Sequence, residues 1–213
     1  MTEAEWLAVT DAAPMLGVAR RDASERKLRL FAAACCRSVW HRLSDWRSRR
    51  VVEVAERYAD GEAPREDVTA AREAIPDGRR FGSAAVAKCV AQFPAGHAAA
   101  STLHMLRCLV AFTDYGPHSP RVSDVSLPVA AAAMRDIFGN PFRPVTFCPS
   151  WRTSTAAALA AGMYEARDFG AMPILADALQ DAGCDTDDIL DHCRGGGPHV
   201  RGCWVVDLVL GKG

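Results

Sequence analysis

The chain has 213 residues, of which 49% are hydrophobic and 24% are charged, and 25 Lys and Arg nearly balance 26 Asp and Glu. This composition is typical of a soluble globular protein with a substantial core, and it excludes a disordered, collagen-like or miniature disulfide-rich protein. A formal net charge of -1 provides no overall attraction to nucleic acid or to anionic membranes. Binding of either kind would need a local basic patch.

The N-terminal segment and the cysteines indicate a cellular compartment. Residues 1–6 are acidic where a secretory signal would be basic and then apolar, so we expect no signal peptide. Residues 89–106 lack Lys, Arg, Asp and Glu, but they contain Gln, Pro and two His, which argues against a transmembrane helix. We therefore expect a cytoplasmic protein whose eight cysteines stay reduced, as buried apolar groups or metal ligands.

Amphipathic spacing predicts helices along most of the first half of the chain. Thr2 and Glu5 have the spacing of a capping box, and Asp11 precedes a second short helix. The clearest pattern begins at Ser24, an expected N-cap, and continues to about residue 43 with apolar residues three and four apart. Further helices are expected over residues 45–60, 64–75, 83–93 and 96–113.

A segment rich in Gly and Pro at residues 115–120 predicts a boundary, because these residues cannot continue either flanking helix. It divides the chain into helical subdomains over 1–115 and 121–213, unless both form one compact domain. Only the run at residues 203–206 is rich enough in β-branched and aromatic residues to suggest a strand. The expected fold is all-α, an irregular array of roughly nine short-to-medium helices. Its second half comprises residues 127–138, 153–166, 172–182, 186–194 and 200–210, with an ordered Pro-rich loop after residue 138.

Four segments carry a resemblance to a known group of proteins. They are residues 3–7 (EAEWL), 24–37 (SERKLRLFAAACCR), 136–144 (DIFGNPFRP) and the tail over 174–212, together about half the chain. These segments resemble an expanded family of uncharacterised planctomycete proteins, for which no activity or catalytic residue is established. Residues 175–183 also resemble a short helical repeat that accompanies leucine-rich repeats in the same bacteria, and this likeness implies an interaction role.

The pattern most typical of a ligand site is a His-x6-His-x3-Cys spacing, which occurs twice. It relates His97, His104 and Cys108 on one expected helix, where these separations return to nearly the same face. It also relates His192, His199 and Cys203, with Cys193 and Cys184 nearby as further thiols. His nitrogen and Cys thiolate suit zinc, which takes four ligands in structural sites. The opposing interpretation is that these cysteines are buried apolar residues, since no Cys-x-x-Cys pair occurs.

Two charged segments have alternative interpretations. Residues 20–50 contain ten Lys and Arg against three acids, and a basic helix of this kind could contact nucleic-acid phosphates. The alternative interpretation is that these basic residues cover a solvated surface or pair with acidic residues of the same chain. The glycine-rich segment 195–201 could cradle a phosphate, but it follows no predicted strand and matches no phosphate-binding motif. The nucleic-acid candidates are Arg26, Lys27, Arg37, Arg49 and Arg50.

The sequence contains no nucleophile elbow, metalloprotease helix or kinase motif, so we assign no catalytic residue and expect no enzymatic activity. It favours a helical protein-interaction or scaffold module that needs no cofactor and binds a protein partner. Zinc binding at the C-terminal His and Cys residues and nucleic-acid binding remain the alternatives. Aromatic side chains in the loops can serve either as core plugs or as binding hot spots. The candidate anchors are Trp151, Trp204, Phe142 and Phe147.

Overall fold

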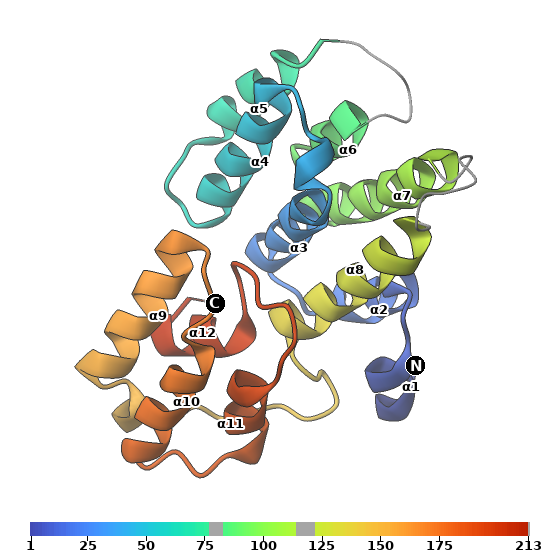
Figure 1. The fold of residues 1–213 in the computed structure, drawn as a ribbon. Coiled ribbons are helices and arrows are strands. Elements are labelled where there is room, and N and C mark those ends of the chain that lie inside the picture. Colours follow the sequence, from blue (N-terminus) through green and yellow to red (C-terminus); the bar gives the residue numbers. More distant parts are fainter. Residues whose placement is uncertain (77–82, 114–121, 213) are drawn as a thin grey trace. The chain divides into compact units, whose positions relative to one another are not determined.

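A computed structural model describes residues 1–76, 83–113 and 122–212, and the regular secondary structure of these residues is helical, with no strand among them (Figure 1). The predicted all-α class is confirmed. The described ranges hold twelve α-helices and two short 3-10 helices, against the roughly nine expected. The segments expected one by one along the chain already number twelve, so the total of roughly nine was an undercount. Among the short helices are α1 (Glu3–Ala8), α2 (Ala12–Ala19) and α12 (Trp204–Leu210).

The chain forms two compact units, Met1–Arg135 and Asp136–Gly213. The linker predicted at residues 115–120 lies outside the described residues. None of the helices in the described ranges combines the length and the apolar character needed to cross a bilayer.

In the first unit, α3 (Glu25–Ser38) packs against α4 (Trp46–Ala59), α6 (Ser83–Val90) and α7 (Ala95–Thr113). Residues 30 to 36 of α3 are all buried. Most of their side chains are small, which lets the neighbouring helices approach α3 closely. Helix α5 (Arg65–Glu73) packs against α4. The expected caps are present, since the amide of Glu5 donates to Thr2 Oγ1 over 3.2 Å and that of Lys27 donates to Ser24 Oγ over 3.3 Å.

The second unit begins in the last turn of α8 (Val122–Phe138). After a loop that contains a 3-10 turn (Pro149–Trp151), the chain forms four further helices around one core. Helix α10 packs against α9 and α11, and α12 packs against α9. These helices are α9 (Ser154–Ala166), α10 (Met172–Asp181), α11 (Asp187–Arg194) and α12.

Two expected elements differ from the observed ones. The helix expected over residues 24–43 ends at Ser38, whose hydroxyl donates to the carbonyl of Cys35 over 2.8 Å, and a 3-10 turn (Trp40–Arg42) follows. The run at residues 203–206 does not form a strand. Cys203 is instead the N-cap of α12, and the buried side chains of Val205 and Val206 join the core of the second unit. Tertiary burial therefore overrides the β-propensity of this run.

Candidate metal centre

Four side chains of the second unit converge on one point. They are Asp136, His192, His199 and Cys203, and one oxygen, nitrogen or sulfur donor from each lies within 4.8 Å of the other three. It is the one group of this kind found among the described residues. Three of its members belong to the C-terminal His and Cys pattern, and the fourth is an aspartate distant in sequence.

The local structure explains how these residues meet. Asp136 lies in the last turn of α8, and His192 lies on α11. Helix α11 ends at Arg194, and the chain turns back before α12, where Gly202 has a φ of +96°, so that His199 and Cys203 face the same point. The amide of Val200 donates to Oδ2 of Asp136 over 2.8 Å, which orients the carboxylate and leaves Oδ1 facing the histidines.

The separations between donor atoms suit a tetrahedral ion. Two ligands bound at about 2.0–2.3 Å to one zinc ion in tetrahedral geometry lie roughly 3.3–3.7 Å apart. Nε2 of His192 lies 3.2 Å from Oδ1 of Asp136 and 3.2 Å from Sγ of Cys203. Nδ1 of His199 lies 2.7 Å from the same carboxylate oxygen and 4.0 Å from the same sulfur. Shifts of up to about 0.6 Å would bring these four separations to ligand distances, and no two donors of the group are more than 4.8 Å apart.

The group is largely closed to solvent. Cys203 is fully buried, and the side chains of Asp136 and His199 are 4% and 8% exposed. Burial alone would raise the pKa of Asp136, but hydrogen bonds and charge from His192 and His199 bring it below its usual value. Burial also raises the pKa of the Cys203 thiol well above its usual range, and the negative charge of Asp136 acts in the same direction. A bound cation would offset the buried carboxylate and favour the thiolate.

The directions of the ring nitrogens distinguish a ligand sphere from a catalytic triad. In a Cys-His-Asp triad the histidine contacts the nucleophile with one nitrogen and the acid with the other. Here the same nitrogen of His192, Nε2, faces both Cys203 and Asp136. Nδ1 of His199 likewise faces both residues, and its Nε2 is buried without a hydrogen-bond partner in the described part of the chain. The donors therefore converge as ligands do and form no relay.

Packing around the group fixes the ring of His192. The indole of Trp204 lies against it, with ring centroids 5.1 Å apart, and the ring of His199 meets it edge to face at 4.9 Å. Gly139 follows α8 with a φ of +65°, and a Cβ added there would lie 3.4 Å from the indole of Trp204. The positive φ of Gly139 turns the chain at the end of α8, next to Trp204 of α12 and three residues after Asp136.

Not every predicted ligand belongs to the group. Cys184 and Cys193 are buried among apolar side chains of the second unit's core, and burial raises the pKa of Cys193 to about 12. They act as small apolar residues. Asp136 was not among the predicted ligands, although the sequence contains one signal for it. An acid in the same turn as the buried Ala133 and Ile137 stands on the apolar face of a helix, where a charge needs a partner.

The first His-x6-His-x3-Cys set forms no comparable group. His97 and His104 are exposed on α7, and the one recorded contact within the set joins Nε2 of His104 to Sγ of Cys108 over 3.6 Å. No acid or further ligand completes a site of three or more donors around them among the described residues. One continuous helix can align such side chains but cannot enclose an ion between them.

Most of the basic candidates for nucleic-acid binding contact their own unit. Nε of Arg26 donates to the buried carboxylate of Asp60 over 3.0 Å. Arg37 makes two hydrogen bonds to the carboxylate of Glu56, of 3.0 and 2.8 Å, and Nε of Arg49 donates to the carbonyl of Leu43 over 2.6 Å. Lys27 is half-buried and Arg50 is exposed. The internally paired interpretation of this region therefore describes three of the five side chains.

The glycine-rich segment does not present a free basic surface either. His199 belongs to the four-residue group, and the guanidinium of Arg201 is buried over the ring of Tyr164 at 4.6 Å from its centroid.

Three of the four candidate aromatic anchors are partly buried against the core of the second unit. Phe147 and Trp151 pack edge to face at 5.5 Å, and Trp204 contacts His192, while Phe142 alone is 39% exposed.

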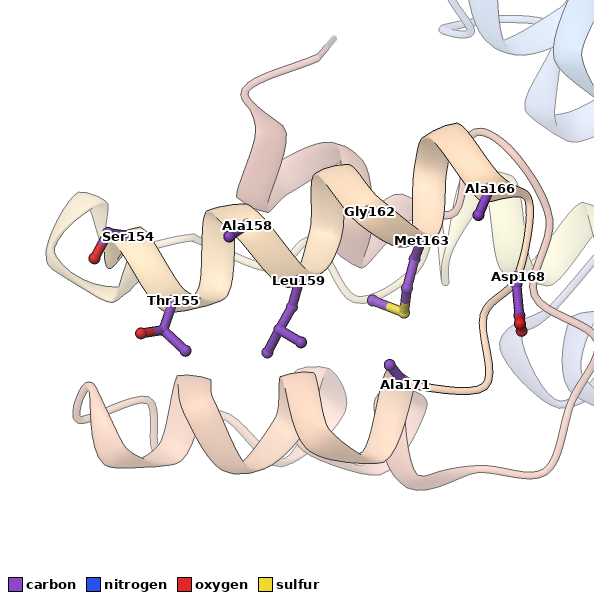
Figure 2. Close-up of a pocket in the computed structure, with 9 residues that line it drawn as sticks. All are labelled: Ser154, Thr155, Ala158, Leu159, Gly162, Met163, Ala166, Asp168 and Ala171. Carbon is purple, nitrogen blue, oxygen red and sulfur yellow. The ribbon is translucent and has the colours of Figure 1, made fainter.

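An open groove lies along α9 in the same unit. It has a volume of about 700 Å³, and Figure 2 shows Leu159 and Met163 pointing from α9 toward α10, with Met163 nearer to Ala171 at the start of α10. Small side chains at Ala158 and Gly162 leave this face of α9 shallow. The groove is suited to an apolar ligand or segment, and the interaction role expected from the sequence stays a prediction.

Comparison with known proteins adds no relative to this picture. The chain matches no protein-family model, no curated protein and no solved structure.

Proposed function

We propose that the second unit binds one Zn²⁺ ion through Asp136, His192, His199 and Cys203, and that the ion has a structural role. The observation that carries this proposal is the convergence of four donors, of three chemical types, from three separate segments. Two imidazole nitrogens, one thiolate and one carboxylate oxygen form a set that zinc accepts, and four protein ligands are typical of structural zinc sites.

Burial supports a structural rather than a catalytic ion. A catalytic zinc keeps an open position for water or substrate, whereas a structural site uses protein ligands at all four positions. The side chains of Asp136, His199 and Cys203 are nearly inaccessible, and His192 is 19% exposed beneath Trp204. The ion would join the end of α8 to helix α11 and the turn before α12, which lie about fifty residues further along the chain.

Such a site is compatible with the interaction role predicted from the sequence. Small helical units bury limited apolar surface, and a metal that binds only the folded form adds stability by mass action. The ion would then hold α11 and α12 in the core of the second unit, against which α9 and its groove also pack.

The test is zinc stoichiometry and affinity of the full chain, purified without a histidine tag. After loading and desalting, elemental analysis should find about one equivalent of zinc. The double variant His199→Ala/Cys203→Ser should retain almost none, whereas the matched double variant His104→Ala/Cys108→Ser should bind as the parent does. Less than about 0.2 equivalents in the parent chain would contradict the proposal.

Substitution with Co²⁺ provides a second measurement that identifies the ligands. Cobalt accepts zinc-like tetrahedral sites and reports thiolate ligation by a sulfur-to-metal absorption band. The band should appear in the parent chain and disappear in Cys203→Ser. It should persist in Cys193→Ser and Cys184→Ser if these variants fold, because both thiols lie outside the group.

A further inference from the structure

A second cavity with a distinct chemistry lies in the first unit, far in sequence from the metal ligands. It has a volume of about 440 Å³, within the range of small-molecule sites, and lies between α5 and the connection from α6 to α7. Arg65 and Arg72 line it from one face of α5, seven residues apart. Gln92, Phe93 and His97 line it from the other side.

Among the described residues, the lining is basic and contains no acidic side chain. Arg65 and Arg72 form no ion pair within the described residues, in contrast to Arg26 and Arg37 of the same unit, which are paired with Asp60 and Glu56. The positive charge of the cavity is therefore not balanced by its own walls. An uncompensated pair of guanidinium groups favours the binding of an anion.

The cavity is also preorganised. The guanidinium of Arg65 lies over the ring of Phe93, 4.1 Å from its centroid, and that of Arg29 lies 4.3 Å from the same centroid. Arg29 is buried and donates to the carbonyls of Val90 and Gln92 over 2.7 and 3.1 Å, which fixes the connection that carries Phe93. Stacking on an aromatic ring holds a guanidinium in place while its edge remains able to donate.

Arg29 adds positive charge beneath the cavity. Burial is the main cause that lowers the pKa of Arg29, the charge of Arg65 acts in the same direction, and Tyr58 and Glu25 act against it. The carboxylate of Glu25 therefore partly offsets the charge of Arg29, and its Oε2 also accepts from the amide of Ala95 over 2.7 Å at the start of α7. That contact occupies the helix N-terminus, so an anion in the cavity would be bound by side chains.

We propose that this cavity binds the phosphate group of a small phosphate monoester, with Arg65 and Arg72 as the principal ligands and His97 at its rim. A phosphate dianion matches the charge of two guanidinium groups, and its three terminal oxygens can accept several of their fork-like donors. A carboxylate offers one charge and two oxygens. The cavity is larger than a phosphate ion, which leaves room for the organic substituent beside Phe93 and Gln92.

Binding of phenyl phosphate to the full chain, measured by calorimetry at moderate ionic strength, tests this proposal. We expect a dissociation constant of about 1 mM or lower. The variant Arg65→Gln/Arg72→Gln should weaken binding at least about tenfold, because it removes both guanidinium ligands. The variant Arg20→Gln/Arg21→Gln makes the same change in net charge at exposed positions outside the cavity, and should bind within about twofold of the parent.

A single variant keeps the test valid if the double variant fails to fold. The side chain of Arg72 is exposed, so Arg72→Gln should leave the helical circular dichroism and the zinc content unchanged and still weaken phenyl phosphate binding severalfold. Zinc content is an independent control, since the proposed metal ligands belong to the other unit.

Three results would overturn the proposal. The first is the absence of binding by the parent at about 10 mM phenyl phosphate. The second is an equal loss in the two double variants, which would indicate long-range electrostatics in place of a site. The third is binding of benzoate as tight as that of phenyl phosphate, which would show that the cavity does not select a phosphate.

Discussion

The two His-x6-His-x3-Cys sets share one spacing and have different surroundings. On α7, His104 and Cys108 are near each other at the surface, and His97 lies two turns away on the same helix. In the second unit, a break after α11 lets His199 and Cys203 fold back toward His192. Only the second set acquires an acid from another element, Asp136, and burial from the surrounding core.

The difference shows that spacing alone does not make a metal site. A helix places side chains on one face, but all of them point outward from one axis, so they cannot surround an ion. A chain reversal brings donors from opposite directions. The reversal between α11 and α12, which includes Gly202 at a φ of +96°, therefore favours the site.

The largest expected effect is a difference in thermal stability between the two sets. A ligand present at a hundredfold excess over its dissociation constant stabilises the form that binds it by about 2.7 kcal/mol. For a domain of roughly 60–100 residues this corresponds to an increase in Tm of about 10 °C or more. Calorimetric scans with and without zinc should show this increase in the parent and in His104→Ala/Cys108→Ser. They should show none in His199→Ala/Cys203→Ser, and an equal increase in all three proteins would refute the assignment.

Removal of the acid should have the next largest effect. Asp136→Asn keeps the shape of the side chain and removes its charge, and loss of even an outer-shell partner costs about 10–100-fold in metal affinity. We therefore expect zinc affinity, measured by competition with a chelator, to fall at least tenfold. Asp188→Asn is the matched control, because that carboxylate is 46% exposed and lies 3.5 Å from Arg143. Its zinc affinity should be unchanged, and equal losses in both variants would point to a general charge effect.

Sequence reasoning could identify three of the four converging residues but not the fourth. His192, His199 and Cys203 are near each other along the chain, so their spacing carries information about their proximity. Asp136 belongs to a different helix, and only the tertiary packing of the end of α8 near α12 brings it to them. Cys184 and Cys193 have the right chemistry and sequence proximity, yet their side chains are buried in the apolar core. The direction in which a side chain points decides whether it joins the metal ligands or the apolar core, and the spacing of residues in the sequence does not encode that direction.

The helices were predictable because the signals that specify them lie close together in the sequence. Capping residues such as Thr2 and Ser24 and the apolar stripe of α3 are local signals, and the structure contains the corresponding helices. The break after Ser38 and the helical state of residues 203–206 depend on contacts with other elements. Local propensity is a weak prior where burial decides the conformation.

A smaller effect should come from the glycine that lets α8 end beside Trp204. Gly139→Ala places a side chain at a φ of +65°, which L residues rarely adopt, and should destabilise the protein by about 1 kcal/mol. Gly162→Ala is the control, because Gly162 is inside α9 with open space around it and its replacement should stabilise by up to about 1 kcal/mol. Denaturant unfolding of both variants measures this, and a shared sign would contradict the role of Gly139.

Thiol labelling can sharpen the comparison without a large change in stability. In mild denaturant, zinc should slow the alkylation of Cys203, because a bound thiolate is protected and the buried group must first open. Cys108 is partly exposed and should be alkylated at the same rate with and without zinc. Mass spectrometry of the labelled peptides gives both rates in one sample. Equal protection of the two thiols would mean that zinc acts on the whole chain.

Cys148 provides the smallest effect and a reference for this experiment, since it belongs to neither set. Its thiol is partly exposed, and hydrogen bonding to Ser150, whose Oγ lies 3.0 Å from Sγ, lowers the pKa of Cys148. A lowered pKa means that the thiolate forms at lower pH, so the alkylation rate of Cys148 should reach half its plateau below the midpoint of an ordinary free cysteine, about 8.5. Cys35 is a buried reference thiol that should be alkylated only on unfolding, because burial raises its pKa to about 12. Ser150→Ala should move the midpoint of Cys148 upward. A midpoint for Cys148 that is unchanged in Ser150→Ala would show that the hydroxyl does not stabilise the thiolate.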